Sequence, residues 1–294
     1  MNDLPVVCIG SALWDTIARA QYPLHPGADV PGRIDRQMGG VALNVALALA
    51  DRGVPVTILS AVGNDADGDA LIAAATARGV DCTYVTRGAF PTDNYNAIES
   101  PDGELFAAVA DCHSLERAGA TVLAPLRDGR LAEANTPYLG TIIVDGNLST
   151  DTLADFAAQK DGQSAFLIFI PASPGKAARL KDSLKSCGGT LFANRIEAEI
   201  LCGRQLSDSN SAALAITQLG ANAVITDSAK SATWVEGQKI RSCTPPDVTV
   251  TSVTGAGDAF LAGFVAAEVA GYPHENWLKA GIDAAATHIS RDIS

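Results

Sequence analysis

Aromatic and basic residues are both scarce in this sequence. Only 5% of its 294 residues are aromatic, and 21 lysines and arginines stand against 33 aspartates and glutamates, a formal net charge of −12. Because the phosphates of a nucleic acid would be repelled by such a surface, we expect no nucleic-acid partner. A small anion in a local site stays compatible with this charge, since net charge describes the surface as a whole.

Long apolar runs and paired cysteines are also missing. The longest apolar stretches, Ala165–Ile170 and Ala259–Ala267, are much shorter than the roughly 20 residues of a membrane-spanning helix. The first residues lack the basic and apolar regions of a secretion signal. The six cysteines are scattered without a Cys-x-x-Cys pair, which is typical of reduced, packed thiols. These absences predict a cytoplasmic protein with no membrane partner.

Apolar residues, by contrast, are plentiful: aliphatic, aromatic and sulfur-containing residues make up 47% of the chain, which excludes a disordered or fibrous protein. β-Branched runs alternate with Ala/Leu-rich stretches of helical period. We expect strands at Val6–Gly10, Val56–Ser60, Thr141–Asp145, Ala165–Ile170, Thr190–Asn194 and Asn222–Asp227, and helices at Val41–Asp51, Asp67–Arg78, Thr150–Lys160, Lys176–Ser186 and Ser211–Leu219. This pattern predicts a doubly wound, mainly parallel α/β sheet with helices on both faces, in a single domain spanning 1–294.

Two segments interrupt the alternation. Residues 14–37 hold three prolines and no helical period, and residues 80–110 read as strand, turn, strand around Pro101-Asp102-Gly103. We expect a small β-sheet from these segments. It would be either a lid over the carboxyl ends of the parallel strands, where α/β sheets bind ligands, or a pair of surface hairpins. The exposed edges of such a sheet also favour a homodimer through the lid.

The strongest site signal lies near the end of the sequence. A β-branched strand runs into Gly255-Ala256-Gly257-Asp258 and then into an apolar, Ala-rich helix. The two glycines allow a sharp turn, and the helix start adds unpaired N–H groups and the positive end of the dipole. Such a cup suits a phosphate or an oxyanion. Asp258 would there act either as a helix cap or as a general base.

Two weaker signals lie in the first fifth of the chain. The pair Gly39-Gly40 opens a helix that carries Asn44 on an otherwise apolar face, so Asn44 is either a buried amide or a ligand contact. Asp15 follows the first strand closely, where it would contact sugar hydroxyls or form a turn.

Taken together and in this order, the motifs resemble the ribokinase-like (PfkB) carbohydrate kinase family. The resemblance covers nearly the whole chain. It includes Asn194-Arg195-Ile196-Glu197, which is similar to the family's Asn-x-x-Glu element. It implies an ATP-dependent kinase in which Asp258 is the base and the amides of Gly255, Ala256 and Gly257 stabilise the transferring phosphoryl group.

The same resemblance implies the binding residues. The sugar contacts would come from Asp15, Gly39, Gly40 and Asn44, and the nucleotide and Mg²⁺ contacts from Asn194, Glu197, Thr226 and Thr254. Glu197 would hold the metal through water. Without the resemblance, Asn194 and Glu197 would be interpreted as a helix cap and a surface glutamate.

Within the family, several strings are most similar to pseudouridine kinases, among them Asp145-Gly146-Asn147-Leu148-Ser149. This similarity implies a small ribose-containing acceptor, with the 5′-hydroxyl of pseudouridine as first choice. The alternatives are a ribokinase or another sugar or nucleoside kinase of the family and, from a different class, a non-catalytic sugar- or nucleoside-binding member.

The sequence also departs from the family pattern. Leu13 replaces an asparagine that would add a hydroxyl contact, and Ser252 replaces an aspartate that helps to seat a monovalent cation, which removes the resemblance's support for activation by K⁺. In the nucleotide-binding string at 226–231, Ser228 and Ser231 replace glycines. Together with the end of the sequence soon after His288, these changes predict weaker ATP binding or another phosphate donor.

Overall fold

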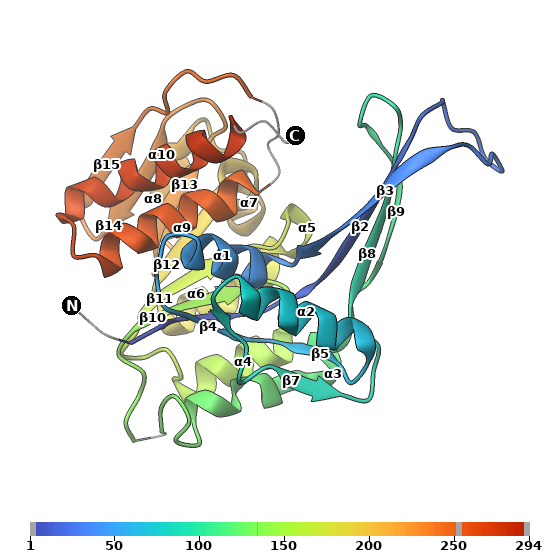
Figure 1. Ribbon diagram of the computed structural model, residues 1–294. Coiled ribbons are helices and arrows are strands. Elements are labelled where there is room, and N and C mark those ends of the chain that lie inside the picture. The colour runs from blue at the N-terminus through green and yellow to red at the C-terminus, as the bar shows by residue number, and fades with distance from the viewer. Residues whose placement is uncertain (1–3, 134, 251–254, 291–294) are drawn as a thin grey trace.

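The computed structural model describes residues 4–133, 135–250 and 255–290, and a nine-stranded sheet runs through its centre (Figure 1). The strands stand in the order β15-β14-β13-β12-β11-β10-β1-β4-β6. Their bounds are β1 Val6–Ile9, β4 Val56–Leu59, β6 Val80–Asp81, β10 Thr141–Asp145, β11 Phe166–Ile170, β12 Thr190–Asn194, β13 Asn222–Thr226, β14 Ala232–Glu236 and β15 Lys239–Cys243. All neighbours pair in parallel except β13 with β14 and β14 with β15. The predicted doubly wound, mainly parallel sheet is therefore confirmed.

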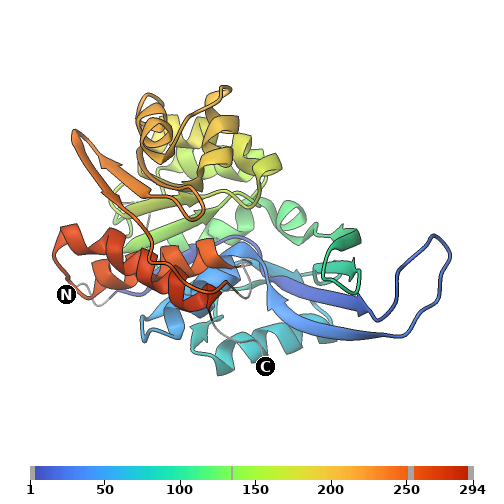
Figure 2. The same cartoon turned by 90° about the horizontal axis from the view of Figure 1, so that it is seen from above.

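Helices cover both faces of this sheet. One face packs against α1 Val41–Ala50, α2 Ala66–Ala77, α9 Ala256–Val269 and α10 Trp277–Ile289. The other packs against α3 Ser114–Ala118, η1 Gly119–Leu126, α4 Thr150–Gln159, α5 Pro174–Ala177, η2 Ala178–Leu180, α6 Lys181–Cys187, α7 Arg195–Cys202 and α8 Ser209–Thr217. The helix expected at Lys176–Ser186 is thus divided by the short 3₁₀ turn η2. Seen from above, α9 and α10 lie at the end of the body opposite the projecting strands (Figure 2).

The side chains of each central strand alternate between two cores. Along β1, Val6 and Cys8 pack with the α1/α9 layer, whereas Val7 and Ile9 pack with the α4/α7 layer. All four are buried, because a strand covered on both faces has no solvent side. No helix of the described part of the chain is long and apolar enough to cross a membrane.

The order of the strands reverses between β1 and β10. From β1 the chain adds β4 and β6 on one side, then returns to build β10, β11, β12 and β13 on the other. In α/β sheets the crevice at the carboxyl ends of such a pair is the usual ligand site. The segments that follow Ile9 and Asp145 therefore lie where this fold is expected to bind a ligand.

A separate four-stranded sheet projects from the body beside this crevice (Figure 1). It consists of β2 Leu13–Ala20, β3 Gly32–Gly39, β8 Asn94–Glu99 and β9 Leu105–Asp111 in the order β3-β2-β8-β9, and we call it the lid sheet. Most of residues 14–37 and 94–110 lie in it. The boundary predicted at residue 80 is wrong, because β6 pairs with β4 in the main sheet and β7 Thr86–Gly88 pairs with β5 Ala61–Gly63.

Candidate active site

A cavity of about 710 Å³ lies between the lid sheet and the body. Asp15 and Tyr95 of the lid sheet form one wall, and Gly40 and Asn44 at the start of α1 form another. Lys176 of α5 also lines the cavity. Three of the four predicted sugar-binding residues, Asp15, Gly40 and Asn44, therefore line one cavity.

The glycine pair allows the junction of β3 and α1 to pack closely against Ser11 and Asp15. A Cβ atom on Gly39 would lie 2.1 Å from the Asp15 carboxylate oxygen Oδ2, and one on Gly40 would lie 2.5 Å from the Ser11 carbonyl oxygen. Gly40 also has φ = 96°, a backbone conformation that favours glycine. Gly39 thus acts by giving room to the Asp15 side chain, and burial raises the pKa of that side chain.

Asp145 organises the crevice, a role that the sequence analysis did not predict for it. Its buried Oδ2 accepts hydrogen bonds from Ser11 N at 2.9 Å, Ser11 Oγ at 2.7 Å and Ala42 N at 3.2 Å. The carboxylate therefore ties the end of β1 to the start of α1. The available signal was an aspartate directly at the end of an apolar strand, next to the point where the strand order reverses.

The network continues to the cavity wall through Asn147. Its Nδ2 donates to Ser11 Oγ at 2.9 Å, and its Oδ1 accepts a hydrogen bond from Lys176 Nζ at 2.5 Å. Ser11, Asn147 and Lys176 all line the cavity, together with Asp93, whose pKa is raised by burial. Sequence reasoning missed these four residues because their proximity arises only when the strands assemble.

Helix α9 begins next to the same crevice. Gly255 is its N-cap with φ = 79°, and among the described residues no side chain caps the helix start. Asp258 lies in the first turn, so it is not the cap that the simpler interpretation expected. A Cβ added to Gly257 would meet no described atom within 4 Å, which leaves space beside the helix start.

The ionisation of Asp258 is strongly perturbed. Burial raises its pKa from 3.8 to about 7, and the nearby carboxylates of Asp145 and Glu197 also raise it. A hydrogen bond with the Asn44 side chain acts in the opposite direction. The structure therefore brings Asn44 into contact with Asp258, in addition to the position of Asn44 on the cavity wall.

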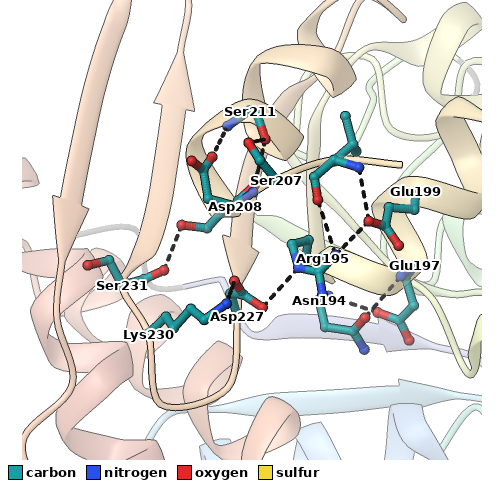
Figure 3. Close-up of polar contacts among 12 residues, drawn as sticks. Asn194, Arg195, Glu197, Glu199, Ser207, Asp208, Ser211, Asp227, Lys230 and Ser231 are labelled. Atoms are coloured by element: carbon teal, nitrogen blue, oxygen red, sulfur yellow. Dashed lines mark hydrogen bonds and ion pairs between the residues drawn. The ribbon is translucent and has the colours of Figure 1, made fainter. Parts of the chain in front are cut away.

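Asn194 and Glu197 form a capping box at the start of α7 (Figure 3). Asn194 Oδ1 accepts from Glu197 N at 2.9 Å, and Glu197 Oε2 accepts from Asn194 N at 2.9 Å. Glu197 is only 8% exposed, so it is not a surface glutamate, and burial raises its pKa. Thr226 ends β13 directly opposite Asn194. Thr254 lies outside the described residues.

This donor set fits a metal–nucleotide better than a bare metal ion. No group of three or more His, Cys, Asp or Glu side chains able to hold a metal is found within 4–133, 135–250 and 255–290. Mg²⁺ that accompanies phosphates usually takes one or two carboxylates and keeps several waters. A buried glutamate together with a helix start that lacks a side-chain cap matches that chemistry.

The fold and the site together define a class of protein. A cavity at the reversal of a parallel sheet, a helix start that suits an anion, and an adjacent carboxyl group with a pKa of about 7 are the parts of an α/β phosphotransferase.

Comparisons with known proteins agree. Residues 4–292 match the sequence profile of the pfkB family carbohydrate kinases. Pseudouridine kinase from Escherichia coli (strain K12) is 31% identical over 277 residues, which cover 91% of this chain and 85% of the relative. Ribokinase from Haemophilus influenzae is 26% identical over 96% of this chain and 91% of its own. The solved structure of a carbohydrate kinase from Agrobacterium tumefaciens has a TM-score of 0.81 and 27% identity, covering 99% of this chain and 92% of that one. The chain belongs to the pfkB family of carbohydrate kinases.

Proposed function

We propose that the protein transfers the γ-phosphoryl group of ATP to the 5′-hydroxyl of pseudouridine. One observation carries the transfer chemistry: Asp258 lies at the start of α9 in contact with Asn44, which lines the acceptor cavity. A base next to an anion-binding helix start is what phosphoryl transfer to a hydroxyl requires.

In this reaction Asp258 accepts the proton of the attacking hydroxyl. Its raised pKa of about 7 suits the role, since a base is most effective when its pKa lies near the working pH. The N–H groups at the helix start, from Gly255, Ala256 and Gly257, stabilise negative charge on the transferring phosphoryl group. Asp15, Gly39, Gly40 and Asn44 orient the ribose, and the lid sheet excludes water that would otherwise accept the phosphoryl group.

The phosphate donor binds on the other side of Asp258. Asn194, Thr226 and Thr254 contact the nucleotide in this proposal, and Glu197 holds Mg²⁺ through water. When bound, Mg²⁺ would neutralise part of the negative charge on the donor's phosphates. This fits a chain with a net charge of −12, because the metal reduces the negative charge with which the donor arrives.

The choice of a nucleoside over free ribose is supported by two cations in the cavity wall. Lys176 and Arg179 line the same cavity as Asp15, Gly40 and Asn44. Their ammonium and guanidinium donors complement the carbonyl oxygens of a uracil ring, which free ribose lacks. The 31% identity with a pseudouridine kinase supports the same choice.

An ADP-release assay with ribose, adenosine, uridine and pseudouridine tests the proposal. Pseudouridine should give the highest kcat/KM. Phosphorylation of ribose but not of pseudouridine would reverse the assignment in favour of a ribokinase. Binding of an acceptor by calorimetry, with no ATP binding at millimolar Mg²⁺, would identify a non-catalytic member instead.

The proposed contact of Lys176 with the base is tested by Lys176→Met. We expect kcat/KM for pseudouridine to fall by about tenfold or more, because a recognition group on the base is lost. The value for ribose should change little. Lys185→Met is the matched control, since Lys185 is exposed on α6 and does not line the cavity.

A further inference from the structure

Arg195 joins the two strand ends that flank the proposed nucleotide site. It follows Asn194 at the end of β12, and Asp227 follows Thr226 at the end of β13, where Asn194 and Thr226 are register partners. Arg195 Nε lies 3.0 Å from Asp227 Oδ1. The ion pair therefore connects the start of α7 with the loop Asp227–Ser231 (Figure 3).

The guanidinium of Arg195 is itself fixed from the side of α7. Its Nη1 donates to Glu199 Oε1 at 2.5 Å and to the Leu206 carbonyl oxygen at 3.1 Å. Glu199 Oε1 also accepts from Leu206 N at 2.9 Å. Since three separate acceptors hold the guanidinium fork, Arg195 presents a rigid group to Asp227.

The loop held by this fork is strained. Ser228 has φ = 53°, and within the described residues only Lys160 shares such a positive φ among non-glycines. A residue in this conformation persists when its surroundings fix it, and such residues gather at ligand-binding sites. The anchors on either side are Asp227, which is only 8% exposed, and Lys230, whose Nζ lies 3.4 Å from Asp227 Oδ2.

We propose that Arg195 is a positioning residue that keeps the loop Asp227–Ser231 in the conformation that binds the phosphate donor. This inference rests on the proposed function, in which Thr226, the residue directly before that loop, contacts the nucleotide. If the guanidinium is removed, the buried Asp227 carboxylate loses the hydrogen bond from Arg195 Nε, so the loop must rearrange to satisfy it. Arg195 does not line the acceptor cavity, so the change should affect the donor alone.

The test is Arg195→Lys, which keeps the charge and loses the fork. We expect the Kd for ADP, by calorimetry, and the KM for ATP to rise on the order of tenfold, the size typical of residues that orient a binding group. The KM for the acceptor should stay the same, and kcat should change less than threefold. Asp227→Asn removes the negative charge that pairs with Arg195. It should likewise raise the Kd for ADP and the KM for ATP without changing the KM for the acceptor, and it replaces the first variant if Arg195→Lys folds poorly.

Arg127→Lys is the matched control. Arg127, which directly follows η1, makes a bidentate ion pair with Asp161, and both arginine side chains are 25% exposed. Arg127→Lys should lower the unfolding temperature without changing the KM for ATP relative to the KM for the acceptor. If Arg195 had only a structural role, Arg195→Lys would have the same effect as this control. If wild type binds ADP and Arg195→Lys binds it equally tightly, the positioning role is wrong. If wild type binds no ADP, the proposed function fails, and this inference fails with it.

Discussion

At the scale of single residues, Asp258 is the side chain whose charge state has the largest consequence. Burial and two neighbouring carboxylates raise its pKa to about 7, and the Asn44 hydrogen bond limits the rise. As a base it must be deprotonated to act. Activity limited by this group should therefore be lost as the pH falls below about 7 and should level off above it.

The variant Asp258→Asn keeps the shape of the side chain and removes the base. We expect kcat to fall by roughly 10² to 10⁴, as is usual for acid–base groups. The rise of kcat/KM with pH around 7 should also vanish in the residual activity. Rapid-quench or coupled assays between pH 5.5 and 8.5 measure both effects. A fall of kcat below about tenfold would mean that another group accepts the proton.

The same pKa shift predicts how the stability of the ligand-free protein depends on pH. Because the folded state binds this proton more tightly than the unfolded state, the contribution of Asp258 is most favourable below 3.8 and is lost as the pH rises through about 7. Asp258→Asn removes that loss. The unfolding temperature of the variant minus that of wild type should therefore become more positive between pH 4 and pH 8, and a constant difference would contradict the shift.

Ser228 is the second residue that gives a prediction at this scale. Its φ of 53° suits glycine, so Ser228→Gly should relieve local strain and stabilise the protein by about 0.5–1 kcal/mol. Ser231→Gly is the control, because Ser231 has no positive φ and its Oγ lies 2.9 Å from Thr244 Oγ1. Chemical denaturation should show opposite effects of the two changes. If both changes destabilise the protein, the contacts of the Ser228 side chain stabilise the fold by more than the strain of its backbone destabilises it.

At the scale of elements, the lid sheet is fastened to helix α2 through Trp14 and Arg36. The indole Nε1 of Trp14 donates to the Asp67 carbonyl oxygen at 3.0 Å. The Arg36 guanidinium lies 4.4 Å from the centre of the Trp14 ring and pairs with the Asp67 carboxylate at 2.8 Å. Since Asp15 is the next residue on β2, this anchor fixes the strand that carries a proposed sugar contact.

Trp14→Phe removes the anchoring hydrogen bond and keeps an aromatic ring. We expect the KM for the acceptor to rise severalfold. ATP hydrolysis without acceptor should also increase relative to transfer, because a looser lid admits water. Trp277→Phe is the control: Trp277 also donates to a backbone carbonyl at 3.0 Å, that of Tyr272, far from the lid. Equal effects of the two changes would speak against a role for the lid in excluding water.

The main elements were predictable because their signals are local. A run such as Thr141–Asp145 is apolar throughout, and only a strand covered on both faces buries every residue of such a run. The beginning of the lid sheet was missed because residues 80–81 and 86–88 also form strands, and these pair with β4 and β5. Pairing of two lid sheets in a homodimer stays a prediction.

The motif residues of the site were predictable in the same way, but their partners were not. Asp258 and Asn44 stand in recognisable strings, yet their hydrogen bond depends on the packing of α1 against α9. The contact of Asp145 with Ser11 joins residues 134 positions apart. Such contacts depend on the order of the strands in the sheet, which cannot be predicted from local patterns in a single sequence.

At the scale of the whole molecule, the acidic surface sets how each substrate approaches. The chain carries a net charge of −12, the proposed donor stays anionic even with its metal, and the proposed acceptor is neutral. Long-range repulsion slows the approach of an anion and leaves a neutral molecule unaffected. The two substrates should therefore respond differently to salt, although they react in one site.

Raising the ionic strength from about 0.02 to about 0.2 M shortens the screening length from roughly 20 Å to less than 10 Å. We expect kcat/KM for ATP to rise about twofold over this range, because screening weakens the repulsion, and kcat/KM for pseudouridine to stay constant. Sodium and tetramethylammonium chloride should give the same curve, since screening does not depend on which cation is present. If kcat/KM for ATP instead falls with salt, the local cations Arg195 and Lys230 dominate the field that the donor meets. Arg195→Lys should then retain that fall, because it keeps the charge, and Lys230→Met should reduce it.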